Sequence, residues 1–197
     1  MRKRICEATV DLLAARGYGG TSMADIAQQV GLSKAGLYNY YRSKEELLLE
    51  LLKRSIEAWR DASRESLERE GSVEERLRRH FETAVDFAID QPSTVTVMRV
   101  TTSLIDGELG ERVLAIVSRY KAEYQKTLEA FFLEALERGE ALDAKPTDLA
   151  LSWRSFLDGF LRQLIYRPAD APELRARVPA VWNILWRGLS GKPSASP

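Results

Sequence analysis

The sequence predicts an all-α protein of nine helices in two domains, a three-helix N-terminal head and a six-helix C-terminal body. Apolar residues recur three and four positions apart along almost the whole 197-residue chain, which is the spacing of one face of an α-helix. Glycines and prolines interrupt this pattern where helices are expected to end: Gly31, Gly71, Pro92 and Gly139. The expected domains are residues 1–44 and residues 45–190, followed by a disordered tail of residues 191–197.

In the head, the first helix ends at the glycine-rich turn of residues 17–20, and two shorter helices follow within residues 21–44. Thr21 or Ser22 can cap the second helix. Its apolar stripe is Met23, Ile26, Ala27 and Val30. Gly31 then makes a corner, after which Ser33 caps the third helix.

Six helices are predicted in the body, over about 44–69, 73–90, 93–105, 109–138, from Thr147 to the loop at Pro168, and 173–189. The first of them is expected to be the only continuous connection between head and body. Threonines and valines make the helix near residue 100 the least favourable in intrinsic propensity. The last two helices carry broad apolar faces that include Trp153, Trp182 and Trp186.

The spacing within the head predicts a helix-turn-helix that reads the major groove of DNA. Ala27 lies four residues before Gly31, and Leu37 lies six residues after it. The small residue allows the two helices to approach, and the leucine fills the space between them. An ordinary helical hairpin is the alternative. It does not account for the short, flat and polar side chains on the outer face of the helix that Ser33 caps.

The candidate DNA-binding residues are Thr21, Ser33, Lys34, Ala35, Gly36, Tyr38, Asn39, Tyr40 and Lys44. We expect the hydroxyl groups and Lys44 to contact phosphates, while Lys34, Ala35 and Asn39 face the bases. The side chains at positions 35 and 36 offer no hydrogen bond. Much of the affinity should therefore come from phosphate contacts and DNA shape.

The charge distribution agrees with a protein that meets DNA at one end. Residues 1–44 hold seven Lys/Arg against three acids, a net charge of +4, so the neutral chain carries −4 in its other 153 residues. Cys6 is the only cysteine, which excludes an internal disulfide and a thiolate metal cluster and favours a reducing cytoplasm. No apolar run approaches the ~20 residues that a membrane span requires.

Residues 37–44, Leu-Tyr-Asn-Tyr-Tyr-Arg-Ser-Lys, together with the turn before them, resemble the signature of the tetracycline-repressor (TetR) family of bacterial transcription regulators. The resemblance extends over residues 2–53, from the basic opening to the Lys-Glu-Glu-Leu that begins the fourth helix. The family most often has Gly-Thr where this chain has Ala35-Gly36, which leaves the base preference open.

The resemblance implies a homodimer in which the last two helices of each subunit form a four-helix interface. Three tryptophans on two peripheral helices support this, because exposed apolar patches mark interfaces. The expected interface residues are Trp153, Leu157, Leu161, Leu164, Val178, Trp182, Leu185 and Trp186. In the alternative, all three tryptophans lie inside one subunit.

The resemblance also implies that a small-molecule effector binds in the body. Candidate lining residues are Trp59, Phe87, Met98, Arg99, Leu104, Tyr120, Tyr124, Phe156 and Phe160. Their character favours an apolar or amphipathic effector, with an arginine available for an acidic group. At helical spacing, each of these residues can equally belong to the core.

No catalytic or metal site and no cofactor is predicted. His80 is the only histidine, which excludes a multi-histidine metal site, and we expect it at the surface or at the edge of the pocket. The sequence thus predicts a cytoplasmic homodimeric repressor, not an enzyme, that leaves a palindromic operator when its effector binds. Its half-sites should lie about 34–36 Å apart or slightly more. A ligand-binding adaptor that does not read DNA, and a transcriptional activator, are the alternatives.

Overall fold

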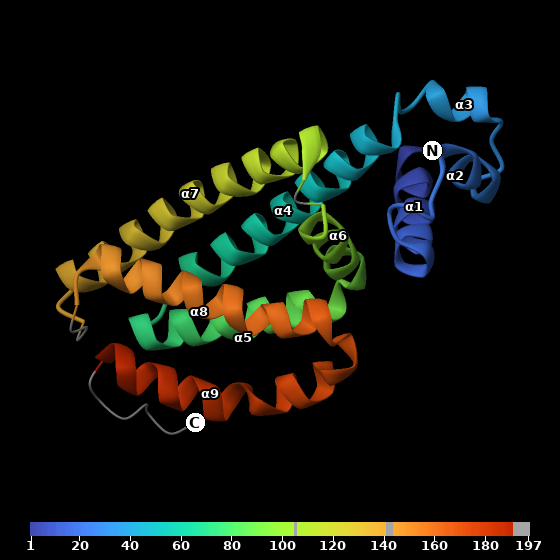
Figure 1. Ribbon diagram of the computed structural model, residues 1–197. Coiled ribbons are helices and arrows are strands. Elements are labelled where there is room, and N and C mark those ends of the chain that lie inside the picture. The colour runs from blue at the N-terminus through green and yellow to red at the C-terminus, as the bar shows by residue number, and fades with distance from the viewer. Residues whose placement is uncertain (105, 141–143, 191–197) are drawn as a thin grey trace. The chain divides into compact units, whose positions relative to one another are not determined.

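The computed structural model describes residues 1–104, 106–140 and 144–190, except for the side chains of residues 165 and 168. These ranges contain α-helices and one short 3₁₀ helix, which confirms the all-α class (Figure 1). The helices are α1 (Arg2–Arg16), α2 (Met23–Gln29), α3 (Lys34–Tyr38), α4 (Lys44–Glu68), α5 (Val73–Asp90), α6 (Pro92–Thr102), α7 (Gly107–Glu137), α8 (Pro146–Tyr166) and α9 (Ala171–Ser190), with η1 (Pro168–Asp170) before α9. The expected disordered tail of 191–197 lies outside the described residues.

The chain forms two compact units whose bounds differ from the predicted domain ranges. Unit 1 comprises Met1–Glu57 and Gln91–Ser118, and unit 2 comprises Ala58–Asp90 and the chain from Arg119 onward. The boundaries fall inside both α4 and α7, so two helices continue from one unit into the other. The helix predicted over about residues 44–69, which follows the head, is α4.

Unit 1 joins the three head helices to the first turns of α4, to α6 and to the start of α7. α1 packs against α2 and α6, and α2 packs against α3. The shared core consists of aliphatic side chains from every one of these helices, among them Ile5, Leu13, Ile26, Leu37, Leu52, Val97 and Val113. The helix-turn-helix is thus fixed on a core that extends well beyond residue 44.

α6 forms in spite of its poor propensity because its side chains satisfy both the core and the backbone. Val97 and Val100 are buried in the unit 1 core. The hydroxyls of Thr101 and Thr102 donate to carbonyls one turn earlier, at 2.9 Å and 2.7 Å. Pro92 stands at the start of the helix, where its missing N–H costs nothing.

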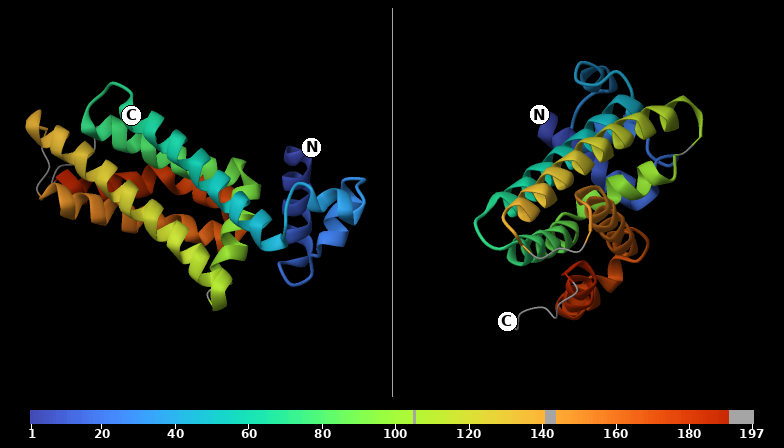
Figure 2. Two further views of the ribbon diagram at one scale, coloured as in Figure 1. Left: turned by 90° about the horizontal axis from the view of Figure 1, so that it is seen from above. Right: turned by 90° about the vertical axis from the view of Figure 1, so that its left-hand side faces the viewer.

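In unit 2, α5 lies beside both α8 and α9, as the views agree (Figures 1 and 2). A capping box begins α5: the backbone N–H of Ser72 donates to Glu75 at 2.8 Å, and the N–H of Glu75 donates to the Ser72 hydroxyl at 3.3 Å. The core combines aliphatic side chains with large aromatic ones, including Phe81, Phe132, Trp153 and Trp182. Within the described ranges, no helix has the length and apolarity needed to cross a membrane.

Candidate functional site

The second helix of the head is capped by Ser22, one of the two residues proposed for that role. The Ser22 hydroxyl accepts from the Asp25 N–H at 3.2 Å, and the Asp25 carboxylate accepts from the Ser22 N–H at 2.8 Å. Hydrogen bonds from Ser22 hold the pKa of the Asp25 carboxyl below its usual value. This reciprocal capping box fixes where α2 begins.

The turn between α2 and α3 depends on Gly31. Its φ of 73° lies in the left-handed region, which a side chain would make unfavourable. The N–H of Leu32 donates to the Ala27 carbonyl at 2.8 Å and closes the turn. Ala27 and Leu37 are both buried, as their spacing predicted.

α3 presents a small and polar outer surface. Lys34, Ala35 and Asn39 are exposed, and the ring of Tyr38 is 43% exposed. The Ser33 hydroxyl accepts from the Gly36 N–H at 3.0 Å and caps the helix. A Cβ at position 36 would lie 3.2 Å from that hydroxyl oxygen, a close contact that a glycine avoids. The glycine therefore also helps to accommodate the cap.

Two of the residues expected to contact phosphates are engaged inside the head. Thr21 is buried, and its hydroxyl donates to the Gly17 carbonyl at 2.8 Å. The Lys44 ammonium donates to the carbonyls of Tyr18 and Thr21 at 2.6 Å and 2.7 Å, and it lies 4.0 Å from the centre of the Tyr18 ring. Burial lowers the pKa of Lys44. These side chains hold the α1–α2 loop against the start of α4, and neither is presented as a free phosphate contact.

Lys44→Met should therefore lower the free energy of unfolding by roughly 1.5 kcal/mol, because two loop carbonyls lose a charged donor. Urea unfolding followed by circular dichroism measures the loss. Lys34→Met is the matched control, since the exposed Lys34 makes no hydrogen bond or ion pair among the described residues. Equal stability of the two variants would contradict the anchoring role of Lys44.

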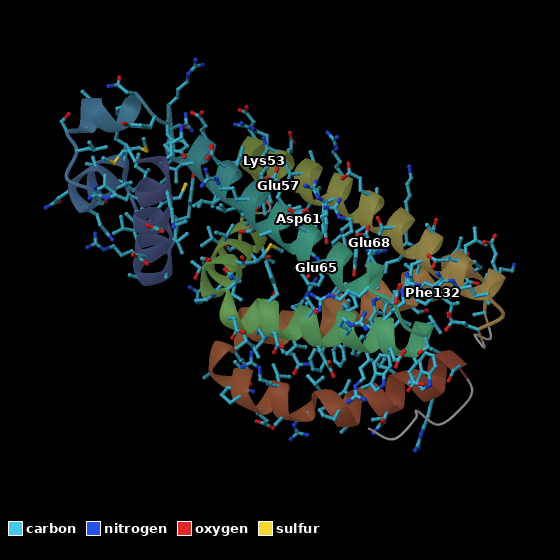
Figure 3. All side chains as sticks on the ribbon, turned by 180° about the vertical axis from the view of Figure 1, so that it is seen from behind. Lys53, Glu57, Asp61, Glu65, Glu68 and Phe132 are labelled. Atoms are coloured by element: carbon cyan, nitrogen blue, oxygen red, sulfur yellow. The ribbon has the colours of Figure 1, made fainter. Side chains whose placement is uncertain are left out.

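The exposed side of α4 limits where DNA can bind. Glu57, Asp61, Glu65 and Glu68 follow Lys53 at helical spacing, and all five residues are exposed along the helix (Figure 3). Asp61 and Glu65 pair with neighbouring arginines, whereas Glu57 and Glu68 make no ion pair among the described residues and would repel the phosphate backbone. DNA is therefore expected to approach through α3 and the residues around it, and not along α4.

The comparisons with known proteins agree with this geometry. A family model described as bacterial regulatory proteins, tetR family, matches residues 5–51. The HTH-type transcriptional regulator YezE of Bacillus subtilis (strain 168) is 31% identical over 150 residues, which cover 74% of this chain and 75% of YezE. The chain belongs to the TetR family of bacterial transcription regulators.

Two solved structures share the fold. FadR from Bacillus subtilis in complex with stearoyl-CoA has 18% identity and a TM-score of 0.78, with 96% of this chain and 100% of FadR covered. AibR in complex with isovaleryl coenzyme A and operator DNA has 22% identity and a TM-score of 0.69, with 93% of this chain and 96% of AibR covered. The match to both extends through unit 2.

Six of the nine residues proposed for the effector pocket of this TetR-family protein come together in unit 2. They are Trp59, Phe87, Tyr120, Tyr124, Phe156 and Phe160. The rings of Trp59 and Phe87 lie 5.5 Å apart, and those of Tyr120 and Tyr124 stack at 5.8 Å. The other three, Met98, Arg99 and Leu104, belong to unit 1, where Met98 and Leu104 pack on its core and Arg99 is exposed.

His80 lies at the centre of this aromatic cluster, contrary to the expectation of a surface or pocket-edge position. It is 0% exposed and stacks on Trp59 at 5.6 Å. Ser66 donates its hydroxyl hydrogen to the Ser63 carbonyl at 2.7 Å, so it must accept from His80 Nδ1 at 2.9 Å. His80 Nε2 then accepts from the Tyr124 hydroxyl at 2.6 Å. The imidazole is thereby held neutral, with its proton on Nδ1.

The helical spacing already contained a signal for this position. His80 lies three residues after Leu77 and four before Ala84, on the buried stripe of α5. Burial lowers the pKa of His80 to about 3. The Tyr120 hydroxyl and the indole nitrogens of Trp153 and Trp182 are buried nearby without a well-aligned hydrogen bond among the described residues, although the Trp59 side chain interacts with Tyr120.

The tryptophans proposed for the dimer interface instead belong to the core of unit 2. Trp153, Trp182 and Trp186 are 1%, 1% and 6% exposed within a single chain. Leu157, Leu164 and Val178 are buried with them, and Leu161 and Leu185 pack against the same cluster. The apolar faces of α8 and α9 point at α5 and α7 of their own chain, so the tryptophans cover an intramolecular core.

Proposed function

We propose that this TetR-family protein is a homodimeric repressor that binds a palindromic operator and is released by an amphipathic effector bound in unit 2. The observation that carries the proposal is the outer surface of α3. Its small and polar side chains are exposed on a helix that the Ser33 cap, Gly31 and Leu37 hold in place. Such a helix can enter a major groove about 12 Å wide. The cytoplasm, where the bacterial chromosome lies, is its proposed place of action.

Selection of fragments from genomic DNA by the purified protein, followed by footprinting, tests the proposal. We expect protection of two half-sites on one face of the duplex. Binding that shows no dependence on salt or sequence would favour the ligand-binding adaptor. Transcription in vitro from the protected promoter then separates repression, a fall in transcript, from activation, a rise.

Asn39→Ala should weaken operator binding about tenfold while changing affinity for random-sequence DNA little, because an exposed amide can pair with a base edge. Tyr38→Phe removes only a hydroxyl and should weaken binding to both duplexes alike, as expected for a phosphate contact. Gel-shift titrations at one salt concentration measure both variants. If Asn39→Ala bound the two duplexes as the wild type does, Asn39 would not read a base.

The effector is proposed to be an acyl thioester or a related amphipathic acid. The rings gathered around Trp59 and Phe87 offer apolar surface, and the buried Tyr120 hydroxyl, which makes no well-aligned hydrogen bond among the described residues, offers one polar group. The coenzyme A thioesters in the FadR and AibR structures support this class. Native mass spectrometry of the purified protein, and operator release by acyl-CoA of increasing chain length, test it.

The exposed sides of α8 and α9 are proposed to form the dimer interface, in place of the buried tryptophans. Leu151 on α8 is 50% exposed, and Ile184 on α9 is 73% exposed. Small residues lie near them on the same sides: Gly159, Ala180 and Gly188. Apolar and small side chains allow two helix pairs to pack closely. Sedimentation equilibrium of the intact protein gives its mass in solution.

A further inference from the structure

A cleft beside α3 contains three arginines that come from three different parts of unit 1. Its volume is about 640 Å³, and its lining includes Arg2 from α1, Arg42 before α4, and Arg112 from α7. The remaining lining residues are Tyr38, Asn39, Tyr40, Ser43 and Glu46. The cleft therefore continues the exposed end of α3, although Arg112 lies some seventy residues away in sequence.

The cleft has an excess of positive charge that the protein itself does not neutralise. Through their guanidinium groups, Arg42 and Arg112 make no hydrogen bond or ion pair with any residue in the described ranges. Arg2 is exposed and only loosely paired, 3.5 Å from Glu50. The one carboxylate of the lining, Glu46, accepts from the Arg42 backbone N–H at 2.7 Å and serves to begin α4.

The geometry points to a site for a phosphodiester of the DNA backbone, with Arg112 of α7 as a DNA contact outside the helix-turn-helix. A guanidinium group can bind two phosphate oxygens at once through two parallel hydrogen bonds, and it remains charged at every physiological pH. Tyr38 and Asn39 lie on the surface proposed to enter the groove, so a flanking phosphate reaches the cleft as α3 docks. This inference rests on the proposed DNA binding.

A backbone phosphate fits the cleft better than a free phosphate ion. The cleft is open, and its arginines are exposed to water. A small free phosphate ion would therefore gain little by giving up its own water contacts for contacts with hydrated guanidinium groups. A phosphate that belongs to a bound duplex is already held by the other contacts, which raises its effective concentration at the cleft.

The site also gives α7 a direct role in operator release. α7 is one helix from Gly107 to Glu137, and Tyr120 of the proposed effector region follows Arg112 by eight residues in its sequence. An effector that displaces α7 would move a DNA contact on the same helix. Release then need not pass through α4 alone.

The test measures DNA affinity against salt concentration for wild type, Arg112→Gln and Arg112→Lys, using the selected operator and a random-sequence duplex. Arg112→Gln should reduce the slope of log K against log salt by about 0.9 for each subunit bound. Arg112→Gln should also weaken binding to both duplexes roughly tenfold. Arg112→Lys should keep most of the slope. Arg119→Gln is the matched control, because Arg119 lies on the same helix outside the cleft and pairs with Glu123.

The outcomes separate the inference from the function on which it rests. If wild type binds with a normal salt slope and Arg112→Gln matches it, the phosphate site is wrong and the repressor proposal stands. If wild type itself shows no salt-dependent binding, both fail. Titration with inorganic phosphate, followed by NMR, distinguishes the source of the anion. Saturation at low millimolar phosphate that Arg112→Gln abolishes, with an unchanged DNA slope, would assign the cleft to a free anion and overturn the inference.

Discussion

Trp153→Ala should lower the free energy of unfolding by about 3–5 kcal/mol, the range for removing a fully buried large aromatic side chain. The indole is 1% exposed. Its ring lies 6.0 Å from that of His80 and 6.3 Å, edge to face, from that of Trp182. Alanine would leave a cavity among rings that cannot close around it without losing their own contacts. A loss of this size is a large fraction of the 5–15 kcal/mol that typically holds a domain together.

Trp153→Phe is the informative comparison. The indole Nε1 is buried without a hydrogen-bond partner among the described residues, as is that of Trp182. Phenylalanine keeps most of the apolar contact and removes an unpaired donor, so its cost should be much smaller. Urea unfolding followed by circular dichroism at 222 nm, a wavelength that reports helix content, measures both variants. If Trp153→Ala instead dissociated the dimer and left each subunit as stable as before, the tryptophan would lie at the interface after all.

The helix-turn-helix could be predicted closely because its determinants are local. Ser22, Gly31 and Ser33 act on backbone groups within a few residues of themselves, and a cap or a left-handed turn has few alternatives. Ala27 and Leu37 meet across a single short turn. At Thr21 and Lys44 the spacing predicted phosphate contacts and did not predict the tertiary partners that these side chains have within the protein. Both side chains bind carbonyls of the α1–α2 loop, and sequence spacing does not reveal those partners.

The body was less predictable because helical periodicity shows which face of a helix is apolar but not which neighbour covers it. The stripes of α8 and α9 were identified correctly. Whether Trp182 faces its own subunit or a second one depends on where α5 and α7 lie, and the pattern contains nothing about that. The same limit explains why Met98 and Leu104 were grouped with Tyr120, although they belong to the other unit.

The arginine cleft shows a third limit. Arg2 and Arg42 contribute to the basic charge of the head, which composition alone detects. Arg112 follows a glycine-rich break, next to an acidic residue, and no motif marks it. Only the fold brings it to the cleft, since the first turns of α7 share the unit 1 core through Val113.

Acidification from pH 7 to pH 5 should lower the free energy of unfolding by about 2 kcal/mol through His80 alone. Burial lowers the pKa of His80 to about 3 in the folded protein, against 6.5 for an ordinary histidine. The unfolded chain therefore takes up a proton as the pH falls below 6.5, and the folded chain does not. Stability is fully present above pH 6.5 and is lost progressively as the pH falls toward 3, at about 1.4 kcal/mol per pH unit once below 6.

The interval between pH 6.5 and pH 5 isolates this effect, because His80 is the only histidine in the sequence. Carboxyls whose pKa the fold lowers, such as Asp25 and Glu134, reduce stability only at more acidic pH, near and below their ordinary values of 3.8 and 4.5. His80→Gln replaces the imidazole with an amide, which can still form hydrogen bonds but does not take up a proton in this pH range. Its unfolding free energy, measured in urea at each pH, should be lower than that of wild type at pH 7 and nearly constant down to pH 5. An equal pH dependence in wild type and His80→Gln would show that the folded protein protonates His80 as readily as the unfolded chain does, and that the imidazole is not sealed between Trp59 and Trp153.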